Sequence, residues 1–132
     1  MELNKLLVKY GEKYAFGKYV KHRRLELKLT ICDLAEKVAI SPAYLCDIEN
    51  GNRIAPKKVL TDLKKELKIL PEHELDFEDL AYMTHETCSP DLIQYLIASK
   101  EARSALRHII ENNVSGREFL EVVINNVKNI EK

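Results

Sequence analysis

The sequence predicts an all-α protein, and three observations support this class. No stretch of the 132 residues alternates between polar and apolar residues for long enough to make a convincing strand. Apolar residues instead recur at helical spacing in one segment after another. Signals that start helices stand where those segments begin, most clearly at Thr30, Ser41 and Ser89. We therefore expect helices nearly throughout.

The first 30 residues contain one clear helical pattern and one ambiguous stretch. Within residues 1–15, leucines and a tyrosine fit one face of a helix, but Gly11 interrupts them. From about residue 16 to residue 27 the pattern of Tyr19, Val20, Arg23 and Leu27 predicts an amphipathic helix.

Two short helices are predicted next, joined by a tight turn. Thr30 followed by Asp33 resembles a capping box with a shorter acid, and it opens a helix over about 31–38. Ser41-Pro42 supplies a side-chain cap and then a proline at the first helical position, where its missing N–H costs nothing. The second helix ends at Asn50-Gly51, a sequence that accepts a left-handed backbone.

The remaining predicted helices follow the same logic of starts and apolar stripes. Pro56 starts a helix that carries Val59, Leu60, Leu63 and Leu67, and the pattern breaks at 69–74. Further helices are expected over roughly 74–83, 90–98 and 100–112, and Ser115 is expected to cap a last one that runs to about residue 129.

Charge divides the chain into two halves. Residues 1–70 carry 15 Lys and Arg against 9 Asp and Glu, a net of +6, whereas residues 71–132 carry 6 against 12, a net of −6. This asymmetry predicts a basic half that meets a polyanion and an acidic half with another role. The alternative is that solvated surface charge happens to segregate.

Other bulk features argue against a secreted protein and against a membrane protein. The first residues lack the charged and apolar regions of a signal peptide, and no apolar run approaches the roughly 20 residues that span a bilayer. Cys32, Cys46 and Cys88 are an odd number without framework spacing, which is typical of a reducing cytoplasm. Cys32 and Cys46 fall inside helical patterns and are expected to be small packing residues. We expect a cytoplasmic protein that does not bind membranes.

The motif with most information combines three runs, FGK at 16–18, LTICDLAEK at 29–37 and ISPAYLCDIENGNR at 40–53, with Arg24 and Pro56 at fixed places between and after them. Over residues 16–69 the chain resembles the Xre/Cro/phage-repressor family of helix-turn-helix transcriptional regulators. The resemblance implies a five-helix, lambda-repressor-like DNA-binding domain over 1–70. A small acidic helical extension over 71–132 would then serve dimerisation or partner binding.

The resemblance also implies residue roles. Ala35, Ile40, Leu45 and Ile48 would form the core between the two short helices, and Arg24 with Glu49 would form a structural ion pair. The second short helix would enter the major groove of DNA, where a helix fits and its first residues reach base edges. The residues expected to face bases are Ser41, Pro42, Ala43, Tyr44 and Asp47, and those expected to contact phosphates are Lys21, Asn52, Arg53 and Lys57.

Two positions depart from many members of the family. Ile31 and Pro42 stand where relatives often have glutamines that contact DNA. One branch of the family has an apolar residue at the first of these sites and a Ser-Pro-x-Tyr-Leu start, and the chain resembles that branch. Base recognition would then depend on Ala43, Tyr44, Asp47 and DNA shape. For Tyr44 the alternative is packing against a neighbouring helix, and for Asp47 it is capping or pairing within the fold.

The second half offers a candidate interface. An apolar stripe at helical spacing would be either internal packing or the contact between two copies, and we favour a homodimer because pairing gives small DNA-binding domains affinity and a preference for palindromes. The stripe consists of Phe119, Leu120, Val123, Ile124 and Val127. An antitoxin or adaptor that binds a partner protein through its acidic helices is the alternative function.

Enzymatic functions find little support. The run His85-Glu86-Thr87-Cys88 lacks the spacing of a His-Glu-x-x-His zinc motif, and two candidate ligands do not make a site. No phosphate-binding glycine loop or nucleophile elbow is present. The sequence therefore predicts no catalytic residue, no metal site and no cofactor.

Overall fold

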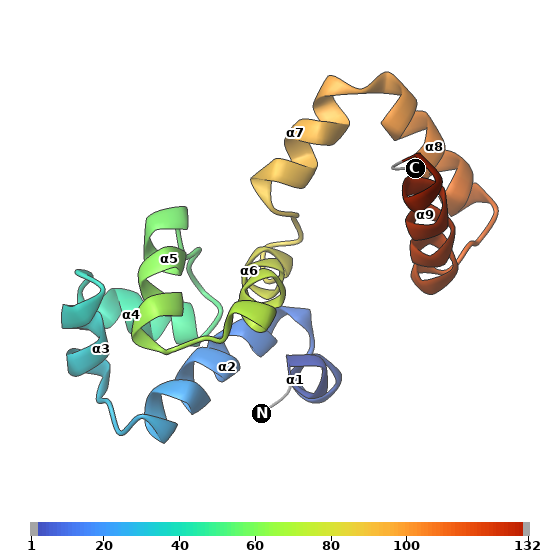
Figure 1. Cartoon of the computed structure of the whole chain (residues 1–132). Helices are drawn as coiled ribbons and strands as arrows, with labels where there is room; N and C mark the ends of the chain where they lie inside the picture. Colours follow the sequence, from blue (N-terminus) through green and yellow to red (C-terminus); the bar gives the residue numbers. More distant parts are fainter. Residues whose placement is uncertain (1–2, 131–132) are drawn as a thin grey trace. The chain divides into compact units, whose positions relative to one another are not determined.

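In the computed structural model, which describes residues 3–130, the chain is all-α, as the sequence predicts (Figure 1). Those residues form nine α-helices, one 3-10 turn and no strand. The helices are α1 Leu3–Tyr10, α2 Glu12–Glu26, α3 Ile31–Lys37, α4 Pro42–Glu49, α5 Lys57–Glu66, α6 Glu74–Met83, α7 Pro90–Ala98, α8 Lys100–Glu111 and α9 Gly116–Ile130, with the 3-10 turn at Pro71–His73. They form two compact units, and the chain passes from the first to the second between Ser89 and Pro90.

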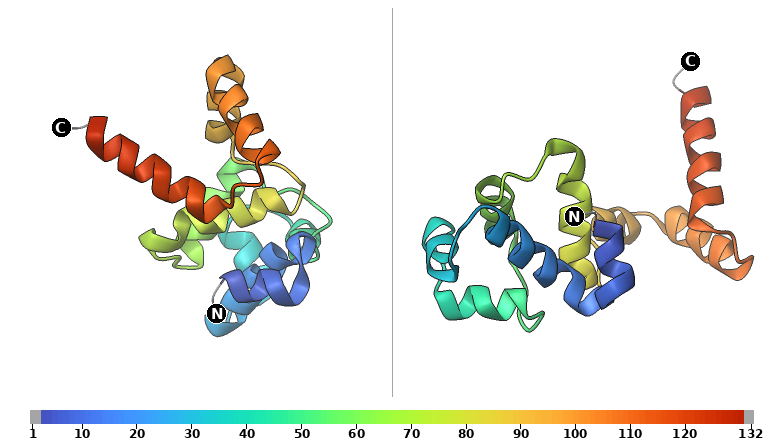
Figure 2. Two further views of the ribbon diagram at one scale, coloured as in Figure 1. Left: turned by 90° about the vertical axis from the view of Figure 1, so that its right-hand side faces the viewer. Right: turned by 90° about the horizontal axis from the view of Figure 1, so that it is seen from below.

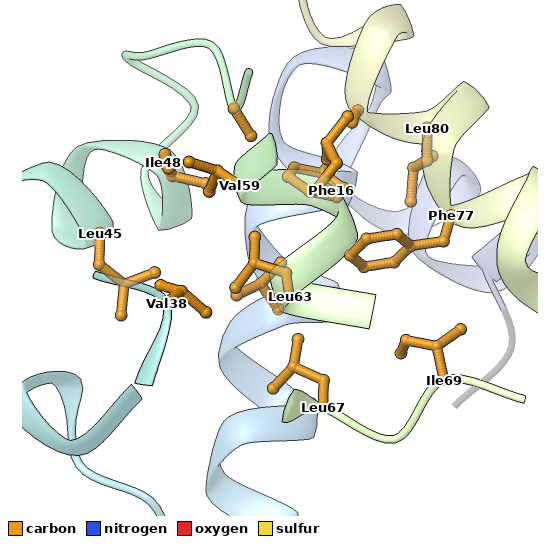
Figure 3. Close-up of a cluster of buried hydrophobic side chains, with 14 of the residues drawn as sticks. Phe16, Val38, Leu45, Ile48, Val59, Leu63, Leu67, Ile69, Phe77 and Leu80 are labelled. Carbon is orange, nitrogen blue, oxygen red and sulfur yellow. The ribbon is translucent and has the colours of Figure 1, made fainter. Parts of the chain in front are cut away.

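The first unit contains α1 to α6 around one apolar core (Figure 3). Phe77 of α6 is fully buried, and its ring centroid lies 5.0 Å from that of Phe16 and 5.8 Å from that of Tyr19 on α2, both in edge-to-face geometry. Edge-to-face pairs at this distance add to the free energy of burial. Helix α6 is therefore part of this unit, which extends 19 residues beyond the division at residue 70 expected from charge.

The N-terminal stretch forms two helices separated by Gly11. Gly11 has φ +78°, a conformation that residues other than glycine rarely adopt, and it stands between α1 and the start of α2 at Glu12. Leu6 on α1 is only 1% exposed, so the first helix contributes to the core. Helix α2 starts four residues earlier than its apolar pattern indicates.

A close approach of two helices fixes the position of α4 against α2. A Cβ atom at Gly17 would lie 2.9 Å from the carbonyl oxygen of Ile48 and nearer still to that of Glu49. Only glycine leaves room for this contact between backbones. The end of α4 thus rests directly on the backbone of α2.

The second unit has helices but no buried core. Of its described residues, 90–130, none is buried. A half-buried stripe on α7 and α8 is formed by Ile93, Leu96, Ala102, Leu106 and Ile109. Helix α9 diverges from α8 after the turn at 112–115 (Figure 2), and 11 large apolar side chains between Leu92 and Ile130 are more than one-third exposed. The unit therefore does not cover these apolar side chains by its own packing.

Candidate nucleic-acid interface

Helix α3 begins at the capping box that the sequence indicates. The Asp33 amide donates to Thr30 Oγ1 at 3.0 Å, and the Thr30 amide donates to Asp33 Oδ2 at 2.9 Å. Hydrogen bonds to the Asp33 carboxylate, first from the Thr30 backbone and then from the Thr30 side chain, hold the pKa of that carboxyl below its usual value. The start of α3 is thereby fixed by local contacts.

A short turn joins α3 to α4. Ala39 takes a left-handed backbone with φ +56°, and the Ile40 amide donates to the Ala35 carbonyl at 3.0 Å. Ser41 then caps α4, because its Oγ accepts the Tyr44 amide hydrogen at 3.1 Å. The hydroxyl oxygen of Ser41, expected to face bases, thus also serves the helix start.

A buried ion pair ties α2 to the last turn of α4. Arg24 and Glu49 are 5% and 6% exposed, and they meet in two contacts, Nε to Oε1 at 2.7 Å and a terminal guanidinium nitrogen to Oε2 at 3.2 Å. The other terminal nitrogen of Arg24 donates to the Leu29 carbonyl at 3.0 Å, just before α3. One guanidinium therefore connects α2, α4 and the segment that leads into α3.

Helix α4 has one buried face and one exposed face. Leu45 and Ile48 are buried with Ala35 of α3, and Ile40 of the turn is half-buried against them. The exposed face carries Pro42, Ala43, Cys46 and Asn50, with Tyr44 and Asp47 half-buried at its edges. The residues expected to face bases are therefore gathered on the first two turns of the exposed face or at its border.

Cysteines on the two short helices were wrongly expected to pack. Cys32 and Cys46 are both exposed, because they lie on the outward sides of α3 and α4. Cys46 and Asn50 share the exposed face of α4, and the Asn50 amide approaches the Cys46 sulfur at 3.6 Å. Helical spacing from Ala43, at i+3 and i+7, is the signal that places both on that face.

The contacts of Tyr44 and Asp47 bear on whether these half-buried side chains face bases or interact within the fold. The hydroxyl of Tyr44 donates to the Ile54 carbonyl at 3.1 Å, and the Arg53 guanidinium lies 4.0 Å from the centre of its ring. Tyr44 therefore contacts the following loop, and its side chain also packs against the apolar core of the first unit. The carboxylate of Asp47 has no hydrogen-bond or ion-pair partner among residues 3–130, which leaves it available to an external donor.

The residues expected to contact phosphates are all exposed. Asn52 and Arg53 lie on the loop after α4, Lys57 begins α5, and Lys21 lies on α2. Of these four residues, Arg53 contacts a residue expected to face bases, because its guanidinium lies over the ring of Tyr44.

The acidic charge is more localised than the two halves of the sequence indicate. Residues 71–89 contain six carboxylates and no lysine or arginine, whereas residues 90–132 contain six of each sign. The acidic segment includes α6, which packs on α2 and α5 and pairs Glu78 with Lys64. In the first unit α6 lies apart from α3 and α4 (Figure 1), so the excess of negative charge is kept away from the exposed face of α4.

The candidate dimer stripe lies on α9. Phe119 is half-buried, and Leu120, Val123, Ile124 and Val127 are between 38% and 56% exposed. The stripe is thus open to a partner.

Comparison of the chain with protein-family models, curated proteins and solved structures finds no match. Within residues 3–130, no helix is long and apolar enough to cross a membrane, and no three or more His, Cys, Asp or Glu side chains gather where they could hold a metal ion.

Proposed function

We propose that the protein is a sequence-specific DNA-binding transcriptional regulator, a repressor that acts as a homodimer on a two-fold symmetric operator. The observation that carries the proposal is the pair α3 and α4, two short capped helices joined by a tight turn and fixed by a buried ion pair. Together with the sequence resemblance, this arrangement supports a lambda-repressor-like helix-turn-helix domain. In that domain α4 is the recognition helix.

The chemistry of α4 supports entry into a major groove. Its exposed face begins with small side chains, so the helix backbone can approach base edges closely. Ala43 offers its methyl group to a thymine methyl, and Asp47 offers a free carboxylate to a cytosine amine. Arg53, Asn52 and Lys57 supply donors to phosphates on the flank. Pro42 contributes no hydrogen bond, so DNA shape carries part of the specificity.

The second unit supports pairing of two copies. Its 11 large apolar side chains that are more than one-third exposed are available to a partner, and burying such surface stabilises an interface. Residues 90–132 have no net charge, so two copies of this segment do not repel each other. Two copies also match the symmetry of a palindromic site.

The dimer is tested with a pair of matched substitutions in the full chain. Val127→Asp places a carboxylate in the α9 stripe, where Val127 is 45% exposed, and Val8→Asp makes the same change at a position on α1 that is 90% exposed. Sedimentation equilibrium is expected to show a dimer for the wild type and for Val8→Asp, and a weaker dimer or a monomer for Val127→Asp. A monomeric wild type at about 100 μM would contradict pairing, since stable interfaces reach micromolar affinity or better.

DNA binding is tested by selecting bound duplexes from a random pool and then measuring affinity at several salt concentrations. We expect a two-fold symmetric consensus with half-sites about one helical turn apart, and an affinity that falls steeply with salt. Failure to enrich any sequence over the starting pool, with protein that is folded and dimeric, would refute sequence-specific recognition.

An antitoxin or adaptor function is the alternative, and one observation favours it. The apolar surface of α7 to α9 would suit a different protein as well as a second copy. Purification from the native host distinguishes the two, because a stoichiometric second protein supports the adaptor and its absence, with a homodimer present, supports the repressor.

A further inference from the structure

The loop between α4 and α5 is attached to the recognition helix by a single side chain. Tyr44 donates its hydroxyl hydrogen to the Ile54 carbonyl at 3.1 Å, and the face of its ring lies 4.0 Å from the guanidinium of Arg53. Two successive loop residues are thus held by one tyrosine from the first turn of α4. Both loop residues are exposed, whereas the tyrosine is half-buried.

These contacts use the groups with which Tyr44 would read a base. A phenol has one hydrogen to donate, and here it goes to a backbone carbonyl. The ring face that would stack on a base or meet a thymine methyl is covered by the guanidinium. Readout by donation from the hydroxyl, or by stacking on this face of the ring, would require these contacts to break.

Arg53, in contrast, keeps its donors free. Among residues 3–130 its guanidinium has no hydrogen-bond or ion-pair partner, and its central carbon lies over the Tyr44 ring, 4.0 Å from the centroid. A stacked guanidinium retains N–H groups around its edge, and that edge matches the oxygens of a phosphate in a bidentate arrangement. Stacking also limits the rotamers of a long side chain before DNA arrives, which reduces the entropy lost on binding.

We propose that Tyr44 is a positioning residue, which holds Arg53 and the loop in place to bind a DNA phosphate, and that it does not specify a base. The proposal rests on the DNA-binding function proposed above and gives Tyr44 and Arg53 different roles in it. Tyr44 then affects affinity for all sequences alike, and sequence preference comes from the exposed face of α4.

The experiment is a double-mutant cycle in the full chain. Tyr44→Leu removes the ring, Tyr44→Phe removes only the hydroxyl, and Arg53→Ala removes the guanidinium. Lys58→Ala is the matched control, because Lys58 is an exposed cation on α5 for which no contact with Tyr44 is found. Dissociation constants are measured for the selected operator and for random duplex at several salt concentrations, with melting temperatures to verify folding.

We expect Tyr44→Leu to weaken binding to operator and random duplex by the same factor, about 3- to 10-fold. The slope of the logarithm of the binding constant against the logarithm of the salt concentration should become shallower by up to about one unit, the value of one lost phosphate contact. The same change is expected for Arg53→Ala. Adding Tyr44→Leu to Arg53→Ala should change little, whereas adding it to Lys58→Ala should multiply the two effects. Tyr44→Phe keeps the stacking face and should lie between wild type and Tyr44→Leu.

Three outcomes overturn the proposal while leaving DNA binding intact. One is a change of preference at a defined base pair in Tyr44→Leu, which would make Tyr44 a base reader. Another is full additivity with Arg53→Ala, which would make the two residues independent. The third is measured without DNA. The ring should shift the side-chain NMR signals of Arg53 upfield in wild type and in Tyr44→Phe but not in Tyr44→Leu. No shift in wild type would show that Arg53 does not stack on Tyr44 in solution. A wild type that binds neither duplex would instead refute the proposed function.

Discussion

Replacing Glu49 by alanine is expected to lower the free energy of unfolding by about 3–5 kcal/mol. The carboxylate is 6% exposed and accepts two hydrogen bonds from Arg24, which is itself 5% exposed. Without Glu49 the guanidinium keeps one contact, to the Leu29 carbonyl, and remains a buried charge without a counter-ion. The expected loss is large because domains of this size are stable by only about 5–15 kcal/mol.

The same reasoning predicts that removing both charges costs less than removing one. The double substitution Arg24→Met with Glu49→Leu takes away the desolvation cost of two buried ions and replaces them with apolar groups of similar length. We expect it to recover most of the loss caused by Glu49→Ala. The carbonyl of Leu29 loses its donor only in the double variant, so recovery is expected to be incomplete.

Urea unfolding, followed by circular dichroism, measures these changes. With a slope of about 2 kcal/mol per molar urea, a loss of about 4 kcal/mol moves the midpoint down by roughly 2 M. A loss below about 1 kcal/mol for Glu49→Ala, which is the range of exposed ion pairs, would refute the claim that the pair is buried and structural. A double variant less stable than Glu49→Ala would refute the argument from desolvation.

Two further predictions concern local features of the first unit and of its caps. Gly17→Ala is expected to lower the free energy of unfolding by about 1–3 kcal/mol, because its Cβ would press on the carbonyls of Ile48 and Glu49. The control is Gly116→Ala, where a Cβ has no neighbour within 4 Å, and it should be neutral in the same urea assay. Asp33 has a lowered pKa in the folded protein, so its contribution is present above the unfolded pKa of about 4 and is lost as pH falls through the lower folded value. Unfolding midpoints between about pH 6 and pH 2 should therefore fall less steeply for Asp33→Asn than for wild type, and equal slopes would contradict the capping interaction.

Helix starts in this chain could be predicted because their signals are local. The box at Thr30 and Asp33, the cap at Ser41 and the cap at Ser115 each depend on residues within three positions, and each forms the expected hydrogen bond. The all-α class follows from such starts together with helical spacing. The joint at Gly11 was less clear, because a glycine with positive φ can either end a helix or join two.

The parts that sequence could not supply depend on long-range contacts. Periodicity indicates that Phe77 lies on an apolar face, but not that this face meets Phe16 rather than the helices that follow. The same limit applied to the cysteines on the short helices, since a small apolar residue suits an inward or an outward position. The contact between Tyr44 and Arg53 spans nine residues across a loop, and no pattern in the sequence marks it.

The placement of the acidic residues changes how the two halves of the chain are interpreted. Because residues 71–89 carry the whole negative excess and belong to the first unit, residues 90–132 have no electrostatic preference for a basic partner. Their apolar faces are then the stronger determinant of what they bind, and hydrophobic association of like with like needs no opposite charge. The acidic helix has a different consequence within the first unit. It lies apart from α3 and α4, so under the proposed function its negative charge would repel DNA away from α4 and would favour approach with α4 foremost.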